Sequence, residues 1–163
     1  MTLELFRIDD RLVHGQVVIG WGLPHALGFL VVVDDEIAAA PWEQELYRMG
    51  TPEGMEVRFA TVAEAAAALA SYRADPRAGM LLTADIATMS RLVAAAPSVT
   101  AVTIGGLHHR ADRAPRLRFV FLSSVEEAAL RALAAGGVAI EAQDVPTSAP
   151  IPLETVLAAD GTA

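Results

Sequence analysis

Residues 29–34, "FLVVVD", form an uninterrupted run of apolar residues that ends at an aspartate. A strand without polar alternation is typical of a sheet that is covered on both faces, because neither side of the strand meets water. Strands of such a sheet run parallel, and each needs a crossover connection, usually a helix, to reach the next. This stretch therefore favours an α/β fold.

The rest of the chain continues the same alternation of strand and helix. The pattern predicts further strands over 3–8, 54–60, 78–84, 99–106, 118–122 and 138–145. It predicts helices over about 15–26, 40–49, 62–72, 86–96 and 125–135. Alternating short strands and helices imply βαβ crossovers. We therefore predict an open, mainly parallel twisted sheet of about seven strands with helices on both faces.

Helix starts and stops support these boundaries. Thr61 with Glu64 matches a capping box, Asp85 is a plausible cap for the following helix, and Ser123 or Ser124 begins the last one. Length and composition favour a single domain over 1–163. We expect its core to cover about 1–147, followed by a tail over 148–163 with one or two helical turns near 153–158.

Charge and residue usage exclude several function classes. The net charge is −8, so a nucleic-acid or anionic membrane surface would be repelled by most of the molecule. All twelve basic residues are arginines, which excludes Schiff-base chemistry and a Walker lysine, and the lack of cysteine excludes disulfides and thiolate nucleophiles. Residues 17–33 carry no formal charge, but glycines and a proline interrupt them, so we do not expect a membrane span.

Ligands of open α/β sheets bind beyond the carboxyl ends of the strands, where the strand order reverses. The segments that follow the predicted strands are 9–16, 34–36, 83–85, 105–110 and 144–147. The first of them lies within "RIDDRLVHGQ", residues 7–16, and contains the most reactive group, His14. A neutral imidazole is a competent nucleophile toward phosphorus near neutral pH.

The neighbours of His14 fit phosphoryl chemistry but do not require it. Arg11 offers a planar cation to phosphoryl oxygens, and Asp9 or Asp10 could set the imidazole tautomer. The same residues also fit a solvated ion pair beside a polar loop histidine. The helix predicted after His14 carries no second histidine or carboxylate at helical ligand spacing from it, which disfavours a metal site. The spacing leaves these roles open.

Four stretches of the chain resemble one protein family. They are "RIDDRLVHGQVVIGW" (7–21), "VVVDDEIA" (31–38), "VTIGGLHH" (102–109) and "VEEAALRALAAGGVAIEAQDVPT" (125–147). Together they resemble enzyme IIB of the mannose/fructose/sorbose family of the bacterial phosphoenolpyruvate-dependent sugar phosphotransferase system (PTS), in the family's order and over nearly the whole chain.

The resemblance implies that His14 accepts a phosphoryl group from the phosphohistidine of enzyme IIA. It would pass the group to a sugar held by the membrane subunits IIC and IID. Arg11 and Asp9 are implied beside His14 at the reacting centre, and we expect Gly15, Gln16 and His108 to bind phosphate. No cofactor and no metal are implied. The protein would be cytoplasmic and peripherally associated with the membrane subunits, and a homodimer is left open.

Other interpretations remain beside this one. A regulatory phosphoprotein of an incomplete system would use the same His14 without moving sugar. A small-ligand or nucleotide module is disfavoured, because no glycine-rich turn follows the first strand. Apolar residues near His14, namely Val13, Leu107 and Trp21, are candidates for docking surface, with helix core as the alternative for Trp21.

Three loops depart from the family's pattern. They are Thr83 to Ile86, the pair His108 and His109, and Asp144. Adjacent loop histidines are either further hydrogen-bond donors to phosphate or solvated residues. The loss of a polar or basic residue from the loop at 83–86 would weaken phosphate contacts, and the added acids at Asp85 and Asp144 disfavour transport-grade turnover. Because two partners must reach His14 in turn, we expect it to be shallow and exposed.

Overall fold

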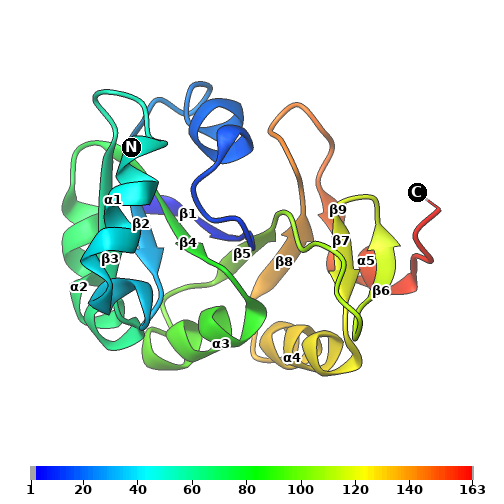
Figure 1. The fold of residues 1–163 in the computed structure, drawn as a ribbon. Coiled ribbons are helices and arrows are strands. Elements are labelled where there is room, and N and C mark those ends of the chain that lie inside the picture. Colours follow the sequence, from blue (N-terminus) through cyan, green and yellow to red (C-terminus); the bar gives the residue numbers. More distant parts are fainter. Residues whose placement is uncertain (1–2, 163) are drawn as a thin grey trace.

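The structure of the chain is a computed structural model, which describes residues 3–162. Its main sheet has seven strands in the order β3-β2-β4-β1-β5-β8-β9 (Figure 1). Their bounds are β1 Leu3–Ile8, β2 Leu27–Val33, β3 Glu56–Ala60, β4 Ala78–Thr83, β5 Ala101–Ile104, β8 Ala139–Ala142 and β9 Ile151–Pro152. Within this sheet, as described over residues 3–162, only the pairing of β8 with β9 is antiparallel. The predicted fold class is confirmed.

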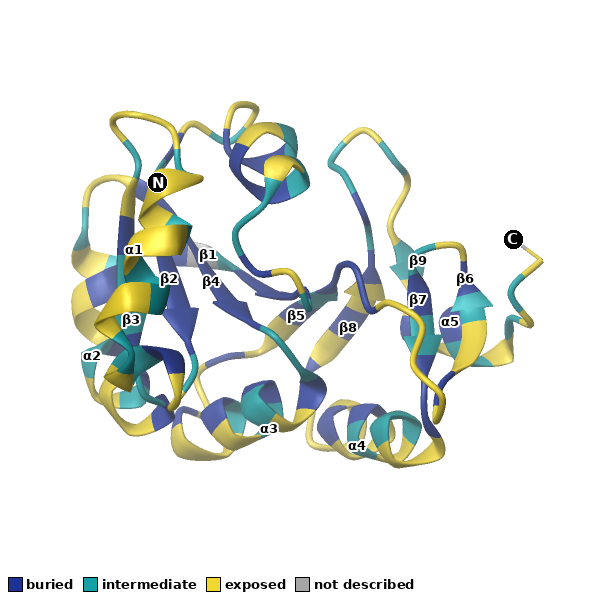
Figure 2. Ribbon diagram, in the orientation of Figure 1, coloured by how far each residue is buried: buried dark blue, intermediate teal, exposed yellow. Residues whose placement is uncertain are grey.

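Both faces of this sheet are buried, as the continuous apolar run of β2 predicts. Phe29, Val31 and Val33 point into one hydrophobic cluster, and Leu30 and Val32 point into another. The helices α2 (Val62–Ala74), α3 (Ile86–Ala95) and α4 (Ser124–Ala135) cover the first face (Figure 2). The short helices η1 (Gln16–Trp21) and η2 (Ile37–Ala39), together with α1 (Pro41–Met49), lie with the second.

The expected helix caps are present. Thr61 and Glu64 form a reciprocal capping box at the start of α2, and Ser123 and Glu126 form a second one at the start of α4. The Asp85 carboxylate accepts a hydrogen bond from the backbone N–H of Thr88 and caps α3. Each cap binds N–H groups that the helix itself leaves without a partner.

The helix expected over 15–26 is shorter and wider than predicted. η1 is a π-helix that ends at Trp21, and β2 already begins at Leu27. Gly22 explains part of this geometry, because a Cβ there would lie 2.0 Å from the Val18 carbonyl oxygen. No helix in the described part of the chain is long and apolar enough to cross a membrane.

The strand expected over 118–122 does not join the main sheet. It is β7 (Val120–Leu122), which pairs antiparallel with β6 (Ala114–Leu117), a strand that the sequence pattern did not predict. The seventh strand of the main sheet is instead β9, within the expected tail. The helical turns expected after it form α5 (Leu153–Ala158), which buries Leu153 and Val156 in the main core. Residues 151–158 thus continue the core.

The strand register brings the predicted ligand loops together. Ile8 at the end of β1 pairs with Thr83 of β4 on one side and with Ile104 of β5 on the other. Ile104 in turn pairs with Ala142 of β8. Four parallel strands therefore end at one level around the central β1, where the chain order reverses between β4 and β5, and the site is expected at such a reversal.

Candidate functional site

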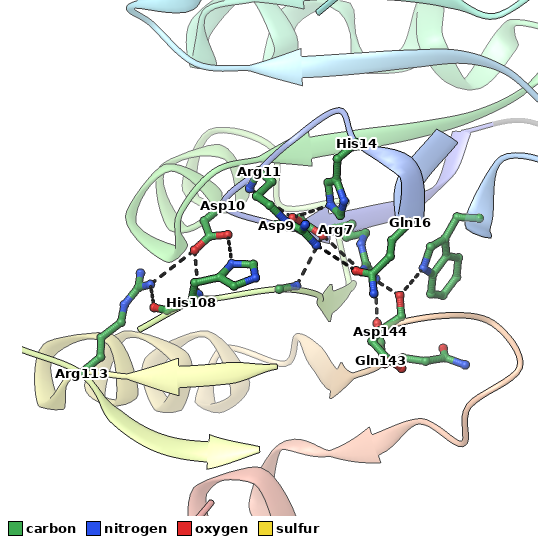
Figure 3. A network of polar contacts seen from close by, with 12 residues as sticks. Arg7, Asp9, Asp10, Arg11, His14, Gln16, His108, Arg113, Gln143 and Asp144 are labelled. Atoms are coloured by element: carbon green, nitrogen blue, oxygen red, sulfur yellow. Dashed lines mark hydrogen bonds and ion pairs between the residues drawn. The ribbon is translucent and has the colours of Figure 1, made fainter. Parts of the chain in front are cut away.

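Asp9, the first residue after β1, is the centre of the site (Figure 3). It is fully buried, and its Oδ1 accepts from the backbone N–H of Arg11 at 3.2 Å and lies 2.9 Å from His14 Nε2. Its Oδ2 accepts from Arg7 Nη2 at 3.3 Å and from the Gly106 N–H at 3.4 Å. Burial alone would raise the pKa of Asp9, but His14 and the Arg7 charge outweigh it and the pKa lies below its ordinary value.

Arg7 is the buried cation that holds Asp9 in place. Its guanidinium donates to the carbonyl oxygens of Gln143 at 2.7 Å and Asp144 at 3.0 Å, and it lies 5.0 Å from the centroid of the Trp21 ring. Burial lowers the pKa of Arg7, and the nearby Asp9 carboxylate opposes that shift. Arg7 thus ties the end of β1 to the segment that follows β8.

His14 reaches Asp9 because the loop between them turns sharply. The Leu12 N–H donates to the Asp9 carbonyl at 2.9 Å, and Leu12 adopts a left-handed conformation with φ of 56°. Non-glycine residues seldom adopt this conformation, and strain of this kind tends to occur at functional sites. Because the ionised Asp9 carboxylate can only accept, it fixes the proton on His14 Nε2 and leaves the Nδ1 lone pair free.

Arg11, Gly15 and Gln16 surround the same loop. Arg11 is exposed, and its Nη2 donates to Gln16 Oε1 at 3.2 Å. A Cβ placed on Gly15 would have no neighbour within 4 Å, so open space lies beside His14. A permanently charged guanidinium next to open space can hold an anion against the imidazole.

Asp10 holds a second histidine. Its Oδ1 lies 2.6 Å from His108 Nδ1, and its Oδ2 accepts from the His108 backbone N–H at 2.7 Å. Arg113 Nη1 donates to the His108 carbonyl at 2.8 Å, while Glu126 accepts two hydrogen bonds from the same guanidinium at 2.8 Å each. In the structure, Asp9 therefore pairs with His14 and Asp10 pairs with His108. The sequence had left open which of the two aspartates contacts His14.

Both acids that depart from the family's pattern accept hydrogen bonds within the protein. Asp85 caps α3, and the Asp144 carboxylate accepts from its own loop at the Val145 N–H and from Arg118 Nη2 at 3.3 Å. The Asp144 carbonyl also accepts from Trp21 Nε1 at 2.8 Å. These partners offset the negative charge that the sequence adds near the site.

The apolar residues near His14 lie mainly in the core. Trp21, the last residue of η1, is buried, as its interpretation as helix core held. Leu107 is fully buried and bridges to Val120, so the prediction that it forms docking surface is wrong. His14 lies deeper than expected, with only 14% of its side chain exposed. Its contact with Asp9 draws the ring toward the sheet.

Sequence reasoning missed two residues of this network. Arg7 and Arg113 are both buried cations, at 1% and 6% exposure. A buried arginine needs a carboxylate or several carbonyl oxygens, so an arginine between the apolar residues Phe6 and Ile8 of β1 was the available signal. For Arg113 there was none, because it stands with Arg110 and Arg116 in a polar stretch whose pattern predicts only a loop. Among residues 3–162, no group of three or more histidine, aspartate or glutamate side chains could hold a metal ion.

Comparisons with known proteins find one matching family and several similar chains. The family model described as the PTS system sorbose subfamily IIB component matches residues 3–163. The N-acetylgalactosamine-specific phosphotransferase enzyme IIB component 2 of Escherichia coli K12 is 31% identical over 157 residues, covering 96% of this chain and 99% of that protein. The PTS system mannose-specific EIIAB component of the same strain is 31% identical over 150 residues, but this chain spans only 46% of its length.

A solved structure also matches the fold. The crystal structure of manxB from Thermoanaerobacter tengcongensis superposes with a TM-score of 0.83 at 31% sequence identity, over 96% of this chain and 95% of that one.

Proposed function

Because the chain belongs to the sorbose subfamily of PTS IIB components, we propose that it carries a phosphoryl group on Nδ1 of His14. The donor would be the phosphohistidine of enzyme IIA, and the acceptor a sugar bound by the membrane subunits IIC and IID. The relative named as a mannose-specific EIIAB component supports a IIA donor. In this proposal the chain works in the cytoplasm, peripherally associated with IIC and IID.

The observation that carries the proposal is the contact between His14 Nε2 and the buried Asp9 carboxylate. The Nδ1 lone pair attacks phosphorus, the donor's P–N bond breaks, and its electron pair stays on the donor imidazole. No proton has to move, because the proton on His14 Nε2 stays there, hydrogen-bonded to the Asp9 carboxylate. The ring becomes more positive as the new bond forms, and the facing carboxylate stabilises that charge.

Arg11 would stabilise the phosphoryl oxygens during transfer. Its guanidinium is permanently charged and exposed, so it can move with the group. We propose that Gln16, held by Arg11, and the open space over Gly15 complete the phosphate site, together with His108, which lines a cavity with Arg11. Phosphoryl transfer depends mainly on such positioning and charge stabilisation.

The test is phosphoryl transfer from phosphoenolpyruvate through enzyme I, HPr and the cognate IIA, followed by mass spectrometry of the labelled peptides. We expect the label from IIA at residue 14, as the Nδ1 isomer. His14→Ala should abolish transfer to the sugar. A His14→Ala protein that still passes the group to sugar would refute the carrier role.

Arg11→Ala should slow transfer and leave the fold intact. The expected decrease is about 10-fold or more, typical of losing one charged contact to a transferring group. Rapid-quench labelling from phospho-IIA measures it, and circular dichroism checks the fold. A wild-type rate would assign Arg11 to the loop structure alone.

A further inference from the structure

Two successive aspartates each hold an imidazole at the end of β1. Asp9 holds His14, and Asp10 holds His108, with a shorter contact of 2.6 Å between Asp10 Oδ1 and His108 Nδ1 (Figure 3). The two pairs are close together. The position of a Cβ on Gly106 lies 3.0 Å from His108 Cε1 and 3.7 Å from Asp9 Oδ1. The proposed function uses the first pair for chemistry and leaves the chemistry of the second unassigned.

The backbone of His108 is held on both sides of its Cα, while its ring remains accessible. Asp10 binds both the backbone N–H and the ring of His108, and the Asp10 N–H donates to the Gly106 carbonyl at 2.9 Å. Arg113, itself buried, fixes the His108 carbonyl. Yet 51% of the His108 side chain is exposed. With Nδ1 facing a carboxylate, the nitrogen available to a ligand is Nε2.

The His108 ring borders a cavity that favours anions. The cavity measures about 480 Å³ and is lined by Asp10, Arg11, Ala84, Asp85, His108, Arg110 and Arg113. Its two acids are occupied, Asp10 by His108 and Asp85 by the N-terminus of α3.

Two of its cations are free to bind an anion. Among the residues that the structure describes, the Arg11 guanidinium donates only to the neutral side chain of Gln16. Arg110 is 60% exposed and reaches Glu126 only at 3.9 Å. A chain of net charge −8 thus places surplus positive charge around one imidazole nitrogen.

We propose that His108 is a second phosphoryl-accepting imidazole, which takes the group on Nε2. The Nε2 lone pair attacks an N-phosphoryl donor, a phosphohistidine or a phosphoramidate, and the P–N bond of the donor breaks. The electron pair leaves with the donor nitrogen. Nδ1–H stays against Asp10, which stabilises the charge that develops on the ring, while Arg11 and Arg110 hold the phosphoryl oxygens. This step does not require His14.

His109 is the matched control within the same loop. It is exposed, but its ring packs edge-on against Phe121 with centroids 5.8 Å apart. Among residues 3–162, no ion pair joins it to an acid. If exposure alone decides the labelling rate, His108 and His109 will be labelled at similar rates. If Asp10 and the cavity decide it, His108 will be labelled faster.

The experiment treats the purified chain with phosphoramidate and follows each histidine by mass spectrometry, with isomer-specific antibodies for Nδ1- and Nε2-phosphohistidine. We expect His108 to be labelled on Nε2 about 10-fold faster than His109, the size of effect that an orienting carboxylate behind an imidazole typically has. Asp10→Asn should reduce His108 labelling to the rate of His109. Arg110→Ala, at an exposed position, should reduce it while the fold is unchanged.

Three results would overturn the inference: equal labelling of His108 and His109, labelling of His108 on Nδ1, or a rate at His108 that neither variant changes. If Asp10→Asn fails to fold, Arg110→Ala decides. Repeating the reaction in a His14→Ala background separates the two proposals. If His108 is labelled in the His14→Ala variant while the wild-type protein accepts no phosphoryl group from IIA, the proposed function is refuted and this inference stands.

Discussion

Asp9 shows how one buried carboxylate serves both stability and chemistry. It lies between the buried cation Arg7 and the imidazole of His14, with two backbone N–H groups completing its contacts. An unpaired charge at this depth would be costly, so each partner depends on the others. The carboxylate that orients His14 is therefore also the counter-ion that lets Arg7 be buried.

We predict that Asp9→Asn destabilises the protein by about 3 to 5 kcal/mol, because Arg7 loses its buried counter-charge. The pKa of Asp9 is lowered in the folded state. Its contribution to the stability of the fold is therefore complete above its unfolded pKa of about 3.9 and is lost as the pH falls through the folded pKa. The stability difference from wild type should thus be constant near neutral pH and narrow in acid.

Urea unfolding across pH measures this difference. Asp112→Asn is the control, since it removes an equal charge from an exposed loop position. A difference that widens as the pH falls would contradict the assignment.

At the level of elements, the site depends on how closely the ends of β1 and β5 approach. Gly105 follows β5, and its N–H donates to the Ile8 carbonyl at 2.7 Å. A Cβ on Gly105 would lie 2.4 Å from Arg7 Nη2, so only glycine leaves room for the guanidinium. The buried cation and the glycine at the next strand end are one packing arrangement.

Gly105→Ala should therefore cost about 1 to 3 kcal/mol, because the guanidinium must shift away from Asp9 and its carbonyl partners. Gly15→Ala is the matched control. Its backbone is already helical, with φ of −52°, and a Cβ there meets nothing within 4 Å. Thermal and urea unfolding compare the two variants. Equal stabilities would mean that Arg7 adjusts without loss.

For the whole molecule, the C-terminal segment is part of the core. β9 pairs with β8, α5 buries Leu153 and Val156, and Arg116 of the hairpin donates to the Ala159 carbonyl at 2.9 Å. This segment closes the sheet edge beside the loop that holds Asp144. The site at the end of β1 is thus supported from the other end of the chain.

Removing residues 149–163 should destabilise the protein by about 3 kcal/mol or more, since two buried aliphatic side chains contribute roughly 1.5 kcal/mol or more each. Removing only residues 160–163 keeps β9 and α5 and should have a much smaller effect. Denaturant unfolding of both truncations tests this. Equal stability of the long truncation and the wild type would show that the segment is dispensable.

Local patterns in the sequence determined most of the fold. Apolar runs and helix caps at Thr61, Asp85 and Ser123 predicted the strand and helix order, because these signals act between residues a few positions apart. The same locality placed His14 after the first strand. It predicted neither β6 nor β9, because Pro115 and Pro152 weaken the local strand signal and only pairing with β7 and β8 makes those strands.

Only the tertiary structure decided which charged groups meet. Asp9 and Asp10 are neighbours in sequence, yet one faces Arg7 and His14 and the other faces His108 and Arg113. Arg7 and His14 belong to β1 and to the loop that follows it, whereas His108 and Arg113 come from the loop between β5 and β6, which the parallel register brings to the same level. Electrostatic contacts depend on distance in space, so the sequence could name the reactive groups but not pair them.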